Sequence, residues 1–250
     1  MPFLTVPPPR FVPRPLVRFV VPALAAGLLW LSPVQAASQA ASQATEPPAG
    51  YAAAMRWYEE QARAGNAKAQ FLLGLSYEQG LRGAEPDAAE AARWYRKAAE
   101  QGHAPAQAKL ALALQFGRGI PADAAEARRW YGKAAEQGLA EAQYNLAYLL
   151  ESGLGGPRDS SRAVYWYEKA AAGGVAAALT ALGGLHARGE GGGEGVPQNL
   201  HEAYKWLTLA AGAGQQGVSE LLRRLGAEMN EAERLDAEAS ARRWLAEHGR

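Results

Sequence analysis

Tryptophan recurs at near-constant spacing along most of this chain. The five residues lie 37, 36, 36 and 40 positions apart: Trp57, Trp94, Trp130, Trp166 and Trp206. Because tryptophan is rare and bulky, this regularity indicates a repeated structural unit. A period of roughly 20–50 residues is typical of solenoid proteins, in which each unit packs only against its neighbours. The spacing therefore favours an array and points function toward a binding surface.

Other residues repeat in step with tryptophan. Alanine lies three residues before each of the five and glycine eight residues after it. Leucine follows at sixteen residues: Leu73, Leu110, Leu146, Leu182 and Leu222. Seven residues before the next tryptophan stand residue types that prefer a helix N-cap: Asp87, Asp123, Asp159 and Asn199. The repeat therefore has a defined helix start in every unit.

Each unit predicts two helices. Alanine, tryptophan and the following tyrosine fall on one apolar helix stripe, and we expect tryptophan to supply most of the apolar area between the helices. Glycine eight residues on suits the left-handed conformation that ends a helix. We predict an all-α fold, an α/α superhelical solenoid of antiparallel helix pairs. The predicted helices span 51–64, 67–79, 87–101, 104–116, 123–137, 140–152, 159–172, 176–188, 199–213, 215–226 and 230–247.

The two ends of the chain depart from the repeat. Asn230 with Glu233 predicts a capping box, and Trp244 follows Trp206 by 38 residues. We expect 51–226 to form the array, as about four repeats after an N-terminal half-repeat. Residues 227–250 are expected to form a capping helix. With the helix before it, this segment makes 215–247 a last, degenerate repeat that caps the array.

The N-terminal residues have the composition of a secretory signal peptide. Within the first 36 residues the only charged side chains are basic: Arg10, Arg14 and Arg18. An apolar run follows from 19 to 31, and Val34 and Ala36 suit the −3 and −1 positions of a cleavage site. We expect a signal peptide over 1–36, a disordered leader over 37–50 and a periplasmic or secreted product. An uncleaved N-terminal membrane anchor is the alternative.

Composition excludes several classes of function. The chain has no cysteine, so it has no disulfide, thiolate nucleophile or cysteine–zinc site. Its 26 basic residues include three in the predicted signal peptide, which leaves 23 against 25 acidic residues. That balance gives no electrostatic reason to expect a nucleic acid as partner. We also expect no stable membrane span after signal cleavage, because the apolar run is shorter than the ~20 residues a spanning helix needs.

The repeat closely resembles the Sel1-like repeat. One segment places sixteen matching residues at that spacing: Ala127, Trp130, Tyr131, Lys133, Ala134, Ala135, Glu136, Gln137, Gly138, Glu141, Ala142, Gln143, Tyr144, Asn145, Leu146 and Ala147. Its 36-residue step differs from the period of about 34 of tetratricopeptide repeats. The resemblance covers about 51–226. It implies a tetratricopeptide-related α/α superhelix and an adaptor that binds other proteins. Some relatives are linked to β-lactam binding, but they are rich in cysteine and this chain has none.

Two motifs could suggest chemistry, and neither is complete. The glycine-rich stretch 189–195 follows no predicted strand, lacks a Lys-Ser or Lys-Thr pair and contains two glutamates, so an inserted loop explains it better than a phosphate site. His201 begins a helical zinc motif, but Lys205 stands where the second histidine is needed. We predict no catalytic residue, no metal site and no cofactor.

A partner surface is expected on the face of the leucine-bearing helices that points away from the core. In related superhelices the first helix of each pair lines the concave surface. The candidate partner-binding residues are Phe71, Lys109, Gln115, Tyr144, Asn145 and Tyr148. Aromatic side chains of this kind dominate many interfaces, although the same rings could instead fill space between adjacent repeats.

The sequence therefore predicts an exported bacterial adaptor or scaffold that binds a protein or an extended peptide on its concave face. The alternative is an envelope enzyme or small-molecule binder, with β-lactam binding or a cell-wall-related hydrolytic activity.

Overall fold

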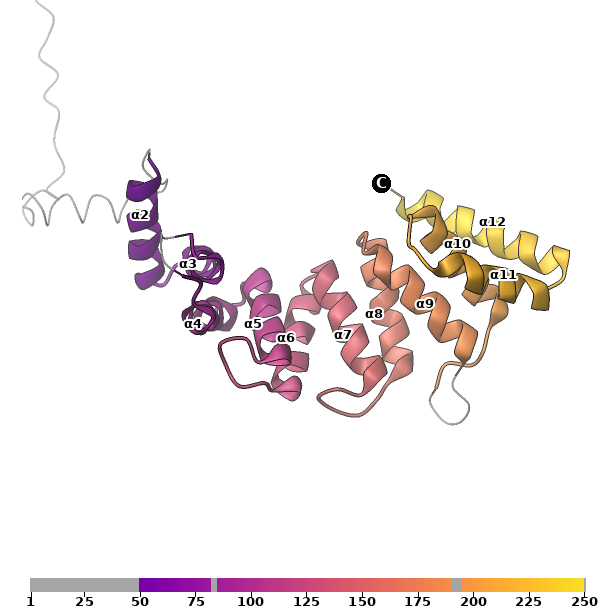
Figure 1. The fold of residues 1–250 in the computed structure, drawn as a ribbon, viewed down its shortest axis with the longest axis horizontal. Coiled ribbons are helices and arrows are strands. Elements are labelled where there is room, and N and C mark those ends of the chain that lie inside the picture. Colours follow the sequence, from indigo (N-terminus) through magenta and orange to yellow (C-terminus); the bar gives the residue numbers. More distant parts are fainter. Residues whose placement is uncertain (1–49, 82–84, 190–194, 250) are drawn as a thin grey trace, which may run out of the picture. The chain divides into compact units, whose positions relative to one another are not determined.

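A computed structural model of the chain describes residues 50–81, 85–189 and 195–249, and these residues form helices joined by turns (Figure 1). The helices are α2 Tyr51–Arg63, α3 Ala67–Gln79, α4 Ala88–Glu100, α5 Ala104–Phe116, α6 Ala124–Glu136, α7 Ala140–Ser152, α8 Ser160–Ala172, α9 Ala176–Arg188, α10 Leu200–Gly212, α11 Val218–Glu228 and α12 Glu231–His248.

The predicted helices are confirmed, with one shifted boundary. Every helix from α2 to α10 has 13 residues, so the unequal tryptophan steps come from the loops between pairs. The segment 189–199 is four residues longer than 153–159, which accounts for the 40-residue step. Residues 190–194 lie outside the described residues. Helix α11 begins at Val218 rather than at 215, because Gly217 before it adopts φ 79° and has no side chain to cap the helix.

An aspartate or asparagine begins α4, α6, α8 and α10 and also anchors the loop before each of them. The predicted N-caps are confirmed: the side chains of Asp87, Asp123, Asp159 and Asn199 each accept a hydrogen bond from the third residue of their helix. Their backbone N–H groups donate at 2.9 Å to carbonyls near the end of the preceding helix, those of Tyr77, Leu114, Leu150 and His186. One residue therefore stabilises both the helix start and the turn.

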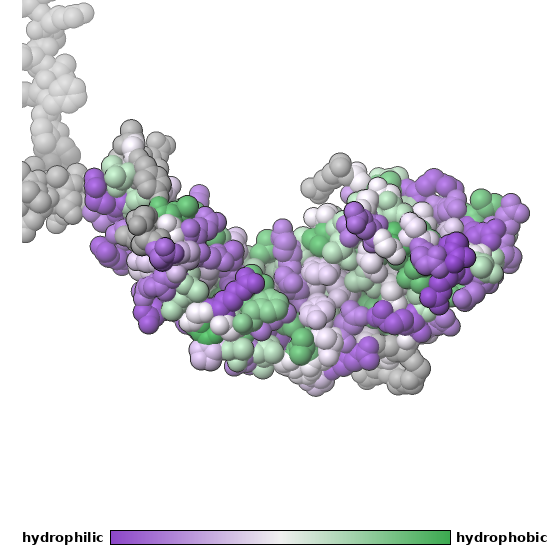
Figure 2. Space-filling model, viewed as in Figure 1, coloured by the Kyte–Doolittle hydropathy of each residue, from purple (hydrophilic) through white to green (hydrophobic). Residues whose placement is uncertain are grey.

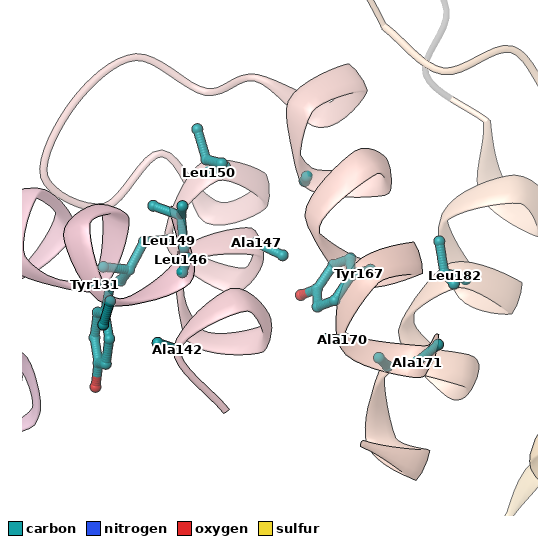
Figure 3. Close-up of a cluster of buried hydrophobic side chains, with 14 of the residues drawn as sticks. Tyr131, Ala142, Leu146, Ala147, Leu149, Leu150, Tyr167, Ala170, Ala171 and Leu182 are labelled. Carbon is teal, nitrogen blue, oxygen red and sulfur yellow. The ribbon is translucent and has the colours of Figure 1, made fainter. Parts of the chain in front are cut away.

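The core is built from leucine, alanine and tyrosine more than from tryptophan. Tyr131 and Tyr167 are each 1% exposed and lie among leucines and alanines from adjacent helices (Figure 3). Trp94 and Trp166, by contrast, are only partly buried. Trp130 and Trp206, at 9% and 2% exposed, do lie in the core, so tryptophan supplies inter-helix area in some repeats and not in others. Both residue types belong to one broad apolar stripe, and the neighbouring helix determines which of them is covered.

The small residues of the leucine-bearing helices allow close helix packing, as predicted. A Cβ added at Gly183 would lie 2.5 Å from Cγ of Leu207 on α10. Within the described residues, helices across the longer loops pack closely, such as α3 with α4 and α7 with α8. The result is a core that runs continuously from α4 to α12, with a smaller cluster of Ala62, Ala69 and Leu73 on α2 and α3.

The last helix is a cap that does not continue the repeat. The predicted capping box of Asn230 and Glu233 is confirmed. Helix α12 packs mainly against α10, whereas the repeat register would place it against α11. Only Met229 and Asn230 connect α11 to α12, so the chain reverses too sharply to form the regular pair. Residues 215–247 are therefore a terminal cap and not a repeat in register.

The predicted signal peptide and leader, 1–36 and 37–50, lie outside the described residues except for Gly50. Among the helices that the structure describes, none has the length and apolar character required to cross a bilayer.

Candidate docking surface

The candidate residues lie on α3, α5 and α7, which are neighbours in one layer. An ion pair of 2.8 Å joins Glu78 on α3 to Lys109 on α5. A second of 2.7 Å joins Glu151 on α7 to Arg188 on α9. On each helix, residues four positions apart share the outer face. The 36-residue step from α5 to α7 places Leu112 at the position of Tyr148 and Phe116 one turn further on. Leu112 and Phe116 of α5 with Tyr144 and Tyr148 of α7 are called the aromatic face below.

Two of the predicted aromatic anchors are partly committed to packing within the array. The Phe71 ring lies 5.9 Å from that of Tyr95 and 4.9 Å from that of His103. The Tyr144 ring lies 5.5 Å from that of Tyr167 on the next helix. Burial raises the pKa of Tyr144. Each ring therefore fills space between helices and is only partly exposed.

Lys109 and Gln115 hold neighbouring helices together. Glu78 accepts hydrogen bonds from Lys109 at 2.8 Å and from the Tyr95 hydroxyl at 2.5 Å. Burial acts to raise the pKa of the Glu78 carboxyl, but these two donors lower it by more, so it lies below its ordinary value. One repeat further on, Gln115 accepts from the Tyr131 hydroxyl at 3.1 Å. Both predicted residues thus have internal partners.

The most accessible part of the aromatic face is Tyr148, which was predicted, and Phe116, which was missed. Tyr148 is 44% exposed and Phe116 is 59% exposed. Asn145 is partly buried beside them on α7. Phe116 stands four residues after Leu112 and immediately before the glycine that ends α5. That spacing could have identified it from sequence, because it extends the outer stripe by one turn.

Buried glutamines connect the first repeats on the side of the helix ends. The side-chain amides of Gln70, Gln107 and Gln143 donate at 3.1 Å to the carbonyls of Ala62, Ala99 and Ala135. Gln101 and Gln137 then donate to the first two of these glutamines at 2.7 and 2.8 Å. The series ends in the next repeat, where Gly173 stands at the position of Gln137 and Leu179 at the position of Gln143. Satisfied amides of this kind fix the register of neighbouring repeats.

The cap of α5 makes stability depend on pH. The unprotonated Nδ1 of His103 accepts from the Ala106 N–H at 3.3 Å, and burial together with Lys68 lowers the pKa of this ring. Because the folded pKa lies below the unfolded value of about 6.5, the contribution is complete above that pH and is lost as pH falls toward the folded pKa.

We expect His103→Asn to flatten this dependence, since asparagine caps the equivalent helix α3 through Asn66 without titrating. Urea unfolding of both proteins between pH 7.5 and about 5 measures the effect. His186, whose pKa burial also lowers, leaves a residual slope in both proteins. Identical pH profiles for the two proteins would contradict a role for the His103 ring.

The described residues contain no group of three or more histidine, aspartate or glutamate side chains placed to hold a metal ion. His201, the one histidine considered for a zinc motif, instead lies with its Nε2 3.1 Å from the Asp236 carboxylate on α12.

Comparison with known proteins gives the same repeat. The Sel1 repeat model matches four times, at residues 67–103, 104–139, 140–175 and 176–215. Each match begins with a leucine-bearing helix, so α3, α5, α7 and α9 are the first helices of their repeats. No curated protein is similar enough to be matched.

Two solved structures are similar over most of the chain. A Sel1 repeat protein from Oxalobacter formigenes is 35% identical, with a TM-score of 0.59 over 74% of this chain and 75% of that one. A protective antigen of uropathogenic Escherichia coli strains, described as having an SLR fold, is 29% identical with a TM-score of 0.67. That match covers 84% of this chain but only 44% of the antigen, so the chain spans less than half of its length. The repeated residues, the helix pairs and these matches agree: the chain belongs to the Sel1 repeat family.

Proposed function

We propose that this protein is a scaffold that binds a protein partner, or an extended peptide segment of one, across the aromatic face. Sel1 repeat proteins are typically interaction scaffolds. The observation that carries the proposal is the exposure of Phe116 and Tyr148, two large apolar side chains on consecutive first helices, one helical turn apart in the repeat. Buried first-helix residues are explained by packing, whereas these two rings remain exposed, Phe116 with the Arg118 guanidinium 5.4 Å from its centre.

The surroundings of these rings support binding rather than chance exposure. Leu112 and Tyr144 continue the apolar surface beneath them, and the ion pairs Lys109–Glu78 and Arg188–Glu151 border it on both sides. An apolar centre with a polar rim is the arrangement of most interfaces. On the face shown in Figure 2, hydrophobic residues form small patches between hydrophilic ones. We therefore propose a partner that places several apolar side chains along an extended segment.

We also propose that the protein acts outside the cytoplasm. The support is the N-terminal sequence, with three arginines, an apolar run and small residues before Ala37. Fractionation of cells that express the full chain, with N-terminal sequencing of the product, tests this. A mature protein that begins near Ala37 in the periplasm or medium supports export, whereas full-length protein in the cytoplasm contradicts it.

The Phe116→Ala/Tyr148→Ala double variant should lose the partner and keep the fold. Both rings are exposed, so their removal costs little stability, while truncation of two interface aromatics weakens binding roughly a hundredfold or more. The measurement is quantitative mass spectrometry of proteins that co-purify with the tagged full chain from envelope extract. Tyr144 is left intact, because its contact with Tyr167 would confuse binding with folding.

The control variant is Leu235→Ala, which removes a similarly exposed apolar side chain from α12. A protein recovered with wild type and with the control, but depleted in the double variant, supports the aromatic face as the site. Recovery of the same proteins in the same amounts by all three would contradict it. Circular dichroism of each purified variant confirms unchanged helix content.

A further inference from the structure

The grooves between successive tryptophan-bearing helices are equivalent in sequence position but differ in what covers them. In the groove between α4 and α6, the Arg96 side chain reaches across to Glu126 at 2.6 Å. The Trp130 indole N–H donates to the same carboxylate at 3.0 Å. An ion pair therefore closes this groove over a buried tryptophan.

The groove between α8 and α10 is covered by the C-terminal helix. The ring of Trp244 on α12 packs edge-on against Trp206 at 5.4 Å, and His248 stacks on Trp244 at 4.7 Å. Both lie along the same cavity as Glu168 and Lys205. Trp206 is consequently only 2% exposed. The chain itself shows that a helix carrying an aromatic residue fits over such a groove.

The groove between α6 and α8 has neither kind of cover. Gly132 stands at the position of Arg96, and Arg162 stands at the position of Glu126, so no bridging ion pair can form. A cavity of about 460 Å³ lies here, with the partly buried Trp166 at its wall. A cavity of about 440 Å³ also remains beside Trp206 in the α8–α10 groove, but there Trp244 and His248 form part of its wall. A Cβ added at Gly132 would meet nothing within 4 Å. The α6–α8 groove thus lacks both the bridging ion pair of the α4–α6 groove and the aromatic cover of the α8–α10 groove.

The walls of this open groove are strongly basic. Arg128, Arg129, Lys133 and Arg162 line it, and Glu136 is the one carboxylate among its lining residues. Arg128 donates to the Pro157 carbonyl at 2.9 Å, which leaves its charge uncompensated. Arg129 lies near enough to Glu126 for its charge to lower the pKa of that carboxyl. Arg162 lies 3.8 Å from Asp159 and its side chain is largely exposed.

We propose that the α6–α8 groove is a second docking site, which takes an acidic helical segment of a partner protein and receives a bulky aromatic side chain from it. The aromatic residue would occupy the space above Gly132 and contact Trp166, as Trp244 contacts Trp206. Carboxylates on either side of it would pair with Arg128, Arg129 and Lys133. This site lies on the tryptophan-bearing helices, so it is separate from the aromatic face and extends the proposed function to two contacts.

The probe is a labelled helical peptide with one tryptophan flanked by glutamates one turn before and after it. Two matched peptides replace the glutamates by lysine, or the tryptophan by alanine. Fluorescence anisotropy with the full chain measures the dissociation constant of each. We expect saturable binding of the acidic tryptophan peptide, at least tenfold weaker binding of both matched peptides, and weaker binding at high salt. Equal binding of the lysine peptide, or no saturable binding of the acidic one, would overturn the proposal.

Variants of the protein locate the site. Gly132→Glu fills the groove and adds a negative charge, and Arg129→Glu reverses the charge of one wall residue. Each substitution should weaken binding of the acidic peptide at least tenfold. Arg93→Glu is the matched control, because Arg93 holds the position of Arg129 beside the closed groove. Glycine is a poor residue inside a helix, so Gly132→Glu should keep or raise the melting temperature. Wild-type affinity of Gly132→Glu for the acidic peptide, or an equal loss of affinity in Arg93→Glu, would exclude this groove as the site. Neither result bears on binding at the aromatic face, which lies on other helices.

Discussion

Tyr167→Ala is expected to lower the free energy of unfolding by about 3–5 kcal/mol, the range for loss of a buried aromatic ring. Tyr167 is 1% exposed, its ring packs against Tyr144, and its hydroxyl donates to Glu151 at 2.9 Å. The substitution leaves a cavity between α7, α8 and α9 and an unpaired acceptor. Urea unfolding followed by circular dichroism measures the change.

The preceding residue supplies the control. Trp166 is larger but only partly buried, so Trp166→Ala should cost clearly less, on the order of 1–2 kcal/mol. Tyr167→Phe keeps the ring and removes one hydrogen bond, at about 1 kcal/mol. A greater loss for Trp166→Ala than for Tyr167→Ala would contradict the conclusion that Tyr167, and not Trp166, forms the centre of the core in this repeat.

Gly155→Ala is expected to destabilise the array by roughly 2–5 kcal/mol. Gly155 adopts φ 75°, where a non-glycine residue costs roughly 1–2 kcal/mol. An added Cβ would also lie 2.2 Å from the carbonyl oxygen of Ala124 at the start of α6. Backbone must move to relieve that overlap, which costs roughly 1–3 kcal/mol more. The difference in unfolding free energy from wild type checks the sum.

Gly138→Ala separates the two contributions. Gly138 also has a positive φ, 87°, but an added Cβ would meet nothing within 4 Å. Its cost should therefore be the left-handed term alone, roughly 1–2 kcal/mol. Equal losses of unfolding free energy in the two variants would mean that the loop around Gly155 can move away from α6 at no cost in stability. The close approach of this loop to α6 would then not hold adjacent repeats together.

Features that depend on a few consecutive residues could be predicted from the sequence. The boundaries of α2 to α10 follow from caps such as Asp123 and from the glycine eight residues after each tryptophan, and both act within one turn of the chain. The capping box of Asn230 and Glu233 is equally local. Only α11 shifted, where Gly217 replaces a side chain that could cap the helix.

Features that depend on which surfaces meet could not be predicted in this way. Adjacent residues such as Trp166 and Tyr167 both fit one apolar stripe, and only the position of the neighbouring helix shows that tyrosine is the buried one. The packing of α12 against α10 likewise depends on a tight reversal after Met229. For the candidate surface, the sequence pattern pointed to Tyr148 but also to Lys109 and Gln115. The hydrogen-bond partners of these two residues lie on other helices, far from them in sequence, so the pattern alone could not show that they are engaged.

Site-specific photo-crosslinking tests the central claim, that the aromatic face binds a protein partner, most directly. A benzophenone side chain is placed at Tyr148 of the full chain, and in a separate protein at Leu235 as a similarly exposed control. Irradiation in cells, followed by mass spectrometry, should give a discrete adduct from position 148 that is absent from position 235 and is lost when Phe116→Ala is added. Adducts of equal yield from both positions, or none from position 148, would contradict the account.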